Sequence, residues 1–130
     1  LPFTISHECA HRTTVTQEAD ANFVAFLACI HSWDPKYRYS GYYSAFIYCY
    51  NAIAKTDKET QSALWNGMND QLRADVLSAN EHYAQYEGKV QDAAQKVNDA
   101  YLKAFSEESG VQSYGEVADL LIAWYLQKTA

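Results

Sequence analysis

The chain has 130 residues, of which 48% are apolar and 20% are charged, a composition typical of one globular domain. Sixteen acidic and ten basic residues give a net charge of -6, which argues against a surface that binds nucleic acid. No apolar run approaches the roughly 20 residues that span a bilayer, so this stretch of chain is expected to be soluble. Three widely spaced cysteines, Cys9, Cys29 and Cys49, cannot form a complete set of disulfides and favour free thiols.

The spacing of apolar residues predicts helices along almost the whole chain. The first two helices are expected from Pro2 to about Arg12 and from about Gln17 to Trp33, separated by a polar, β-branched segment. Asp34 and Pro35 form a pair typical of a helix start. An aromatic helix is then expected from about Gly41 to Lys55.

The second half of the chain contains two patterns typical of helix starts, Thr56–Glu59 and Ser113–Glu116. A break near Gly67 is expected to precede a helix over Gln71–Tyr86, and the clearest amphipathic stripe predicts another helix over Val90–Ala104. No segment shows convincing alternation of apolar and polar residues. We therefore predict an all-α fold of about six helices in a single domain.

The sharpest chemical signal is the segment His7–His11, which reads HECAH. Two histidines four residues apart on a helix point in the same direction, so both imidazoles can bind one metal ion. Glu8 lies beside that face, where it can accept a proton from a metal-activated water without being a ligand. The pattern predicts His7 and His11 as metal ligands and Glu8 as the catalytic general base.

A catalytic zinc site of this kind needs a third protein ligand and an open fourth position. Glu18 and Asn22 are four residues apart and share one face of the next helix. A carboxylate on a largely apolar helix needs a cation or hydrogen-bonding partners, which favours Glu18 as the third ligand. The pattern Glu-x-x-Ala-Asn also resembles the gluzincin arrangement, in which the glutamate binds zinc and a polar residue one turn on orients a ligand histidine, and this resemblance implies that role for Asn22. Asp20 points to a different face and is the second choice.

Five segments carry a resemblance to a known family: LPFTISHECAH, EADANFVAFLAC, RYSGYYSA, VNDAYLKA and GVQSYGEVADLLIA. They resemble the C-terminal part of an uncharacterised bacterial membrane-protein family, a domain of unknown function with a gluzincin-like zinc-peptidase signature. The resemblance implies that residues 1–130 belong to a longer protein, anchored in the bacterial cell membrane by N-terminal segments that this chain lacks. It also implies zinc ligands at His7, His11 and Glu18, with Glu8 as general base.

The chain departs from the pattern of that family at two positions. The family typically has glycine where this chain has Thr14, and if that glycine serves a left-handed turn, Thr14 must strain or reroute the loop that carries Glu18. The family usually has leucine where this chain has Cys9, which is expected to pack as a small hydrophobe rather than bind metal. Arg38 and Tyr39, from the family's RYSGY segment, are further candidates for lining the site.

These patterns predict a zinc-dependent metallohydrolase. The favoured activity is that of a peptidase, with a peptide or protein as the substrate. The rival hypothesis is a helical metal-binding or protein-interaction module whose site is structural or vestigial. A structural zinc usually has four protein ligands, whereas this sequence offers three, which favours an open site. A cysteine hydrolase that uses Cys9 and His11 is disfavoured because no helix N-terminus or matched partner activates the thiol.

Overall fold

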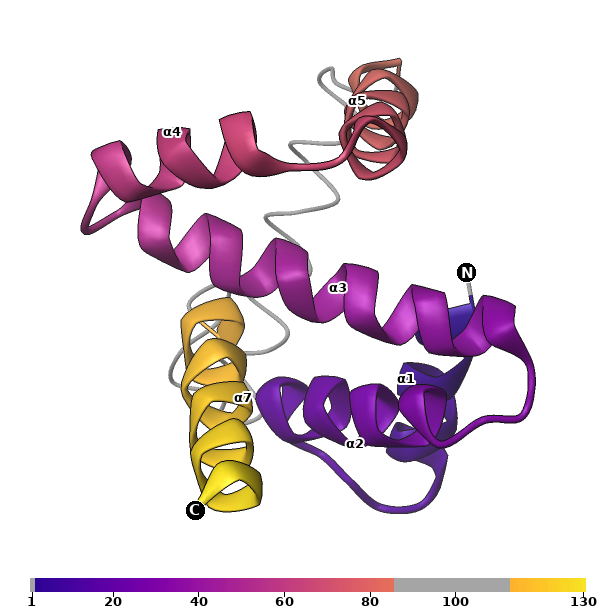
Figure 1. Ribbon diagram of the computed structural model, residues 1–130. Helices are drawn as coiled ribbons and strands as arrows, with labels where there is room; N and C mark the ends of the chain where they lie inside the picture. The colour runs from indigo at the N-terminus through magenta and orange to yellow at the C-terminus, as the bar shows by residue number, and fades with distance from the viewer. Residues whose placement is uncertain (1, 86–112) are drawn as a thin grey trace. The chain divides into compact units, whose positions relative to one another are not determined.

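The computed structural model describes residues 2–85 and 113–130, and their regular secondary structure is helical throughout (Figure 1). The helices are α1 (Pro2–Arg12), α2 (Glu18–Ile30), α3 (Pro35–Ala54), α4 (Lys58–Gly67), α5 (Asp70–Ala84) and α7 (Ser113–Thr129). The predicted all-α fold class is therefore confirmed for the described residues. The helix predicted over Val90–Ala104 lies outside them. None of the described helices has the length and apolar character needed to cross a membrane.

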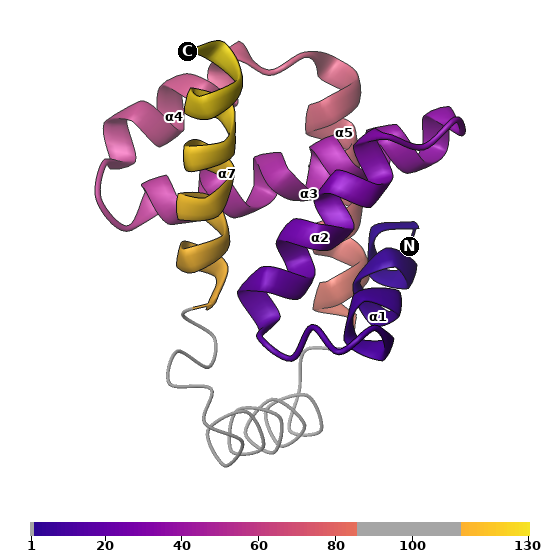
Figure 2. The same cartoon turned by 90° about the horizontal axis from the view of Figure 1, so that it is seen from below.

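The chain divides into two compact units, one made of Leu1–Thr56 with Val111–Ala130 and the other of Asp57–Gly110. In the first unit α1 packs on α2 and α3, and α7 packs on the same two helices (Figures 1 and 2). Its core consists of Phe3, Ala19, Ala25, Phe26, Cys29, Val117 and Leu121. Helix α2 contributes most of these residues, so the helix that begins with Glu18 is also the centre of the packing. The organisation of residues 1–130 as a single domain stays a prediction.

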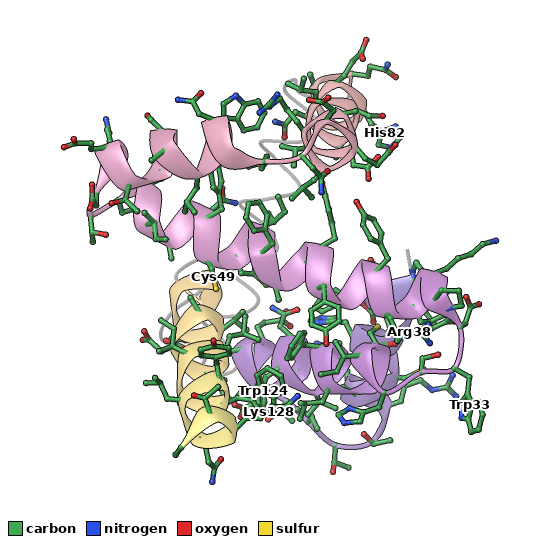
Figure 3. The ribbon with its side chains drawn as sticks, viewed as in Figure 1. Trp33, Arg38, Cys49, His82, Trp124 and Lys128 are labelled. Atoms are coloured by element: carbon green, nitrogen blue, oxygen red, sulfur yellow. The ribbon has the colours of Figure 1, made fainter. Side chains whose placement is uncertain are left out.

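Helix α2 ends three residues before its predicted end. Its last residue is Ile30, and the side chain of Trp33 is 98% exposed and points away from the helices (Figure 3). The prediction that this helix continues to Trp33 is wrong. The physical reason lies in Pro35, because proline and the cap before it favour extended backbone in the residues that precede them.

Helix α3 begins at Pro35, six residues before its predicted start at Gly41. Asp34 is the N-cap, and its carboxylate accepts a hydrogen bond of 2.8 Å from the backbone N–H of Lys36. The predicted role of the Asp34–Pro35 pair is confirmed, and it sets the start of the helix. Gly41 is buried, and a Cβ atom there would lie 2.7 Å from Cβ of Cys29. Helices α2 and α3 therefore approach each other closely at this point.

Helix α4 begins one residue later than the capping pattern at Thr56 predicts. Asp57 is the N-cap, and its carboxylate accepts a hydrogen bond of 2.9 Å from the backbone N–H of Thr60. The hydroxyl of Thr56 instead donates a hydrogen bond of 3.3 Å to the carbonyl oxygen of Ile53 at the end of α3. The predicted cap at Thr56 is therefore wrong, because a carboxylate one residue on is the better acceptor for the exposed N–H groups. The predicted break near Gly67 is confirmed.

Candidate metal centre

The two histidines of the HECAH segment lie one turn apart on α1, on its C-terminal half. The ring centroids of His7 and His11 are 4.5 Å apart with the rings nearly perpendicular, and their Nε2 atoms are separated by 3.0 Å. Phe3, one turn before His7, and Ala10, directly before His11, are buried on the same side of the helix and hold that side against the core. The helix therefore presents the same nitrogen of both imidazoles to one point, as the spacing predicts.

Glu18 is the first residue of α2 and brings its carboxylate to the same point. One carboxylate oxygen lies 3.0 Å from Nε2 of His11, and the other lies 3.4 Å from Nε2 of His7. Within residues 2–85 and 113–130, these three side chains form the group whose donor atoms all lie within 4.8 Å of one another. Asp20 is exposed and lies outside this group. The geometry thus favours Glu18 over Asp20 as the third ligand.

The spacing of the three donor atoms matches that around a small divalent ion. Around a tetrahedral zinc ion with bonds of about 2.0–2.1 Å, neighbouring ligand atoms lie about 3.3–3.4 Å apart. The distances found here, 3.0, 3.0 and 3.4 Å, come within a few tenths of an ångström of that value. The side chains of His7, His11 and Glu18 are 14%, 26% and 26% exposed, so the cluster is held by its surroundings but remains reachable by water. The donor set fits zinc with an open fourth position.

His11 is oriented by a hydrogen bond from its second ring nitrogen. Its Nδ1 lies 2.7 Å from the carbonyl oxygen of Val15, and because a carbonyl can only accept, Nδ1 carries the proton. In the neutral ring, Nε2 of His11 is then the nitrogen without a proton and is available to a metal, which is the arrangement found in most histidine metal ligands. Nδ1 of His7, in contrast, is buried with no hydrogen-bond partner in the described part of the chain. Nδ1 of His11 is therefore held by a hydrogen bond to the backbone, whereas Nδ1 of His7 has no such bond within the described residues.

The acceptor for His11 is placed by the turn that ends α1. The N–H of Val15 donates to the carbonyl of Ala10 and the N–H of Thr14 donates to the carbonyl of His11, both over 3.2 Å. This pair of hydrogen bonds defines a Schellman C-cap, in which the residue after the cap adopts a left-handed conformation. That residue is Thr14, with φ of 74°. The left-handed turn considered for the glycine of the resembled family is therefore present in this chain, with Thr14 in place of glycine.

Glu8 and Asn22, which the sequence also predicts to act at the site, differ in burial and in their hydrogen-bond partners. Glu8 is exposed next to His7, and the described residues offer it no hydrogen-bond or ion-pair partner. Asn22 is buried, and its side-chain oxygen accepts a hydrogen bond of 3.3 Å from the hydroxyl of Tyr48. Support of a ligand histidine by Asn22 and proton transfer by Glu8 stay predictions.

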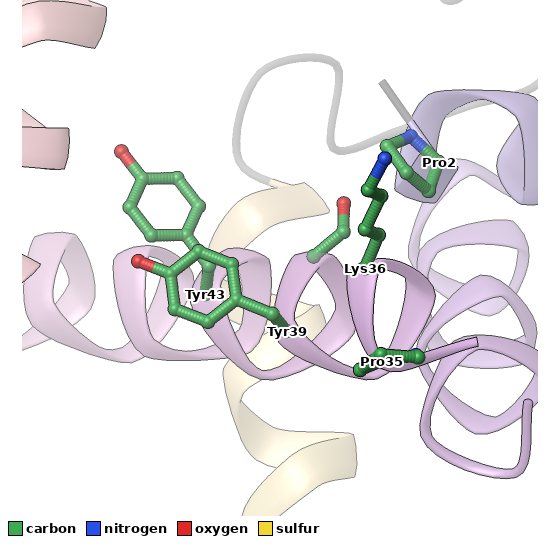
Figure 4. Close-up of a pocket in the computed structure, with 6 residues that line it drawn as sticks. Pro2, Pro35, Lys36, Tyr39 and Tyr43 are labelled. Atoms are coloured by element: carbon green, nitrogen blue, oxygen red, sulfur yellow. The ribbon is translucent and has the colours of Figure 1, made fainter. Parts of the chain in front are cut away.

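Arg38 stabilises the connection between α2 and α3. One nitrogen of its guanidinium group donates to the carbonyl oxygens of Ser32 and Trp33 over 2.9 and 2.8 Å (Figure 3). Tyr39 stacks on Tyr43 with ring centroids 6.1 Å apart. The lining of a cavity of about 550 Å³ consists of Pro2, Pro35, Lys36, Tyr39, Ser40 and Tyr43 (Figure 4). A role of Arg38 or Tyr39 in lining the metal site stays a prediction.

The three cysteines are free thiols in different environments. Cys9 is exposed, so its predicted packing as a small hydrophobe is wrong. It lies on the outward side of α1, away from the buried Phe3 and Ala10. Cys29 is fully buried in the core, with its sulfur 3.4 Å from the hydroxyl of Ser6. Cys49 is half-buried, and this burial raises the pKa of its thiol.

The fold and the cluster together define an all-α protein with a candidate metal-binding triad of two histidines and one glutamate. The chain belongs to the family described as a protein of unknown function (DUF3810), whose model matches residues 1–122. The match includes all three members of the triad. Neither a curated protein nor a solved structure matches the chain. The predicted membership of a family of unknown function is confirmed, and the activity has to be argued from the residues.

Proposed function

We propose that this chain carries the zinc centre of a metallohydrolase, and that the enzyme is a peptidase. The observation that supports this most strongly is the convergence of Nε2 of His7, Nε2 of His11 and the Glu18 carboxylate, with separations of 3.0 to 3.4 Å. Two imidazoles and one carboxylate are a ligand set of catalytic zinc sites in hydrolases, and three protein ligands leave a position open for water or substrate.

Zinc, when bound, supplies a Lewis acid that lowers the pKa of water and polarises a carbonyl group. Glu8 is exposed beside His7 and outside the ligand set, so its carboxylate is available to accept a proton from the attacking water. The same carboxyl group then donates that proton to the leaving amine. Two histidines four residues apart with a glutamate after the first is the arrangement in which zinc peptidases place their general base.

The substrate and setting of the proposed enzyme follow from the same chemistry and from the resemblance. A polarised carbonyl and a base that returns its proton to an amine suit the amide bond of a peptide or protein. The resemblance to a bacterial membrane-protein family supports a position at the cell membrane, through segments outside this chain. Zinc is the proposed cofactor, and nucleic acid is not a proposed partner.

The substitution Glu8→Gln tests the proposed chemistry because it keeps the size of the side chain and removes the base. In zinc-loaded protein we expect unchanged zinc affinity and a loss of peptide cleavage of about 10²–10⁴-fold, the usual contribution of a positioned base. Glu59→Gln, an exposed glutamate in the first turn of α4, is the matched control and should keep full turnover. Equal turnover by wild type and Glu8→Gln would contradict the assignment of the base. A filled zinc site with no cleavage across a broad peptide library would favour a structural site.

A further inference from the structure

Thr14 is the one non-glycine residue with a positive φ in the described part of the chain. At φ of 74°, an L-residue brings its Cβ too close to the following carbonyl, and a β-branched side chain makes the contact worse. Backbone strain of this kind persists where the surrounding structure requires it, and it is concentrated at functional sites. The residues on either side of Thr14 indicate the role of its conformation.

The turn at Thr14 connects the two halves of the candidate metal centre. Before it, His11 carries one donor atom, and directly after it, Val15 directs its carbonyl oxygen to Nδ1 of that same histidine over 2.7 Å. Three residues further on, Glu18 begins α2 with a carboxylate oxygen 3.0 Å from Nε2 of His11. In a right-handed conformation at position 14, α1 would continue for another residue and the Val15 carbonyl would point along the helix axis instead.

We propose that Thr14 is a positioning residue for His11. Its left-handed conformation places the Val15 carbonyl as the acceptor that holds His11 as the Nδ1–H tautomer, with Nε2 unprotonated and directed at the metal position. The part of this proposal that concerns metal affinity rests on the proposed zinc centre, and the part that concerns the tautomer does not.

The two histidines differ in what fixes their tautomers. Nδ1 of His11 lies 2.7 Å from the carbonyl oxygen of Val15, so in the neutral ring the proton is on Nδ1. Nδ1 of His7 is buried without a hydrogen-bond partner in the described residues, so no comparable acceptor fixes its tautomer. A metal bound through Nε2 requires the Nδ1–H tautomer in both rings.

Nitrogen-15 chemical shifts of the two rings test this directly, at a pH where both imidazoles are neutral. We expect the neutral ring of His11 to carry its proton on Nδ1 both with and without zinc. A population of His11 that is mainly Nε2–H in the zinc-free chain would overturn the proposal.

Two substitutions at position 14 test the role of the turn. Thr14→Gly retains the left-handed conformation without strain and should leave both the His11 tautomer and the zinc affinity unchanged. Thr14→Pro cannot adopt a positive φ, so it should release His11 into a mixture of tautomers and weaken zinc binding by about 10–100-fold, the usual effect of losing an orienting partner. Thr16→Gly, on an exposed residue of the same type in the same loop, is the control and should change neither.

A backbone substitution tests the role of the Val15 carbonyl even if Thr14→Pro unfolds α1. Replacing Thr16 by its α-hydroxy analogue turns the Val15 carbonyl into an ester carbonyl, a weaker acceptor, without altering any side chain, and Cys29 provides a ligation site for the synthetic segment. We expect this protein to show mixed His11 tautomers and weaker zinc binding. An unchanged His11 tautomer in this protein would overturn the proposal. The predicted tautomers without any zinc binding would refute the zinc centre and uphold the positioning role of Thr14.

Discussion

Replacing Gly41 by alanine should weaken the packing of α2 against α3 and hence the support of the helix that begins with Glu18. The new Cβ atom would lie 2.7 Å from Cβ of Cys29, which is bonded directly to the α2 backbone, so the helices themselves must move apart. Overpacking of this kind costs about 1–3 kcal/mol, and alanine recovers about 1 kcal/mol over glycine through its helix propensity. We expect a net loss of about 1 kcal/mol in the free energy of unfolding.

Gly115→Ala is the matched control, because a Cβ atom at Gly115 in the first turn of α7 would have no atom within 4 Å. It should stabilise the protein by about 0.5–1 kcal/mol, so the two variants should differ by about 2 kcal/mol. Urea unfolding of wild type and both variants, compared at constant slope, measures the difference. If Gly41→Ala stabilises the protein as much as Gly115→Ala does, the close approach of α2 and α3 is refuted.

Two further predictions concern thiol reactivity and pH. An alkylating reagent should modify the exposed Cys9 first and the fully buried Cys29 last, with Cys49 between them because burial raises the pKa of its thiol. Peptide mapping over time measures the order, and equal rates at Cys9 and Cys29 would contradict it. Hydrogen bonds from the side chain and backbone of Thr60 hold the pKa of the Asp57 carboxyl below its usual 3.8. Its stabilisation of α4 is therefore complete above that pH and is lost as the pH falls through the lower, folded pKa. Asp57→Asn should remove this acid-dependent loss of helicity, and an unchanged pH profile of the circular dichroism signal would contradict it.

Features contained within one helix or one turn could be predicted from the sequence. The separation of His7 and His11 places both rings on one face because of the helical repeat alone. Asp34 and Pro35 were correctly predicted as a pair typical of a helix start, although the helix itself was predicted only from Gly41. The prediction of Glu18 as the third ligand needed a further argument, namely that a carboxylate on an apolar helix requires a partner. In the structure its oxygens lie 3.0 and 3.4 Å from the Nε2 atoms of the two histidines.

Features that depend on backbone atoms or on distant packing could not be predicted in this way. The acceptor for His11 is the carbonyl of Val15, a group that every residue possesses, and its position depends on one dihedral angle at Thr14. The family glycine at this position indicated the turn but not its partner. The exposure of Cys9 was missed because the spacing of apolar residues does not show which side of a short helix meets the core.

The cap at Asp57 shows a further limit of local patterns. Thr56 and Asp57 are both good N-cap residues, and the capping pattern alone favours Thr56 because Glu59 stands three residues later. In the structure the Asp57 carboxylate accepts the N–H of Thr60, and the Thr56 hydroxyl is used by the end of α3. Which of the two adjacent residues becomes the N-cap depends on the residue at which α3 ends, and the sequence does not specify that residue.

The zinc affinity of Glu18→Gln, compared with that of Asp20→Asn and wild type, tests the candidate metal centre most directly. Both substitutions remove one negative charge from the first turn of α2, but only Glu18 has oxygens within 3.4 Å of the two histidine nitrogens. We predict that wild type and Asp20→Asn bind about one zinc ion per chain. In Glu18→Gln we predict that the zinc affinity falls by about 100-fold or more. Equal zinc affinity in Glu18→Gln and wild type would contradict the centre proposed here.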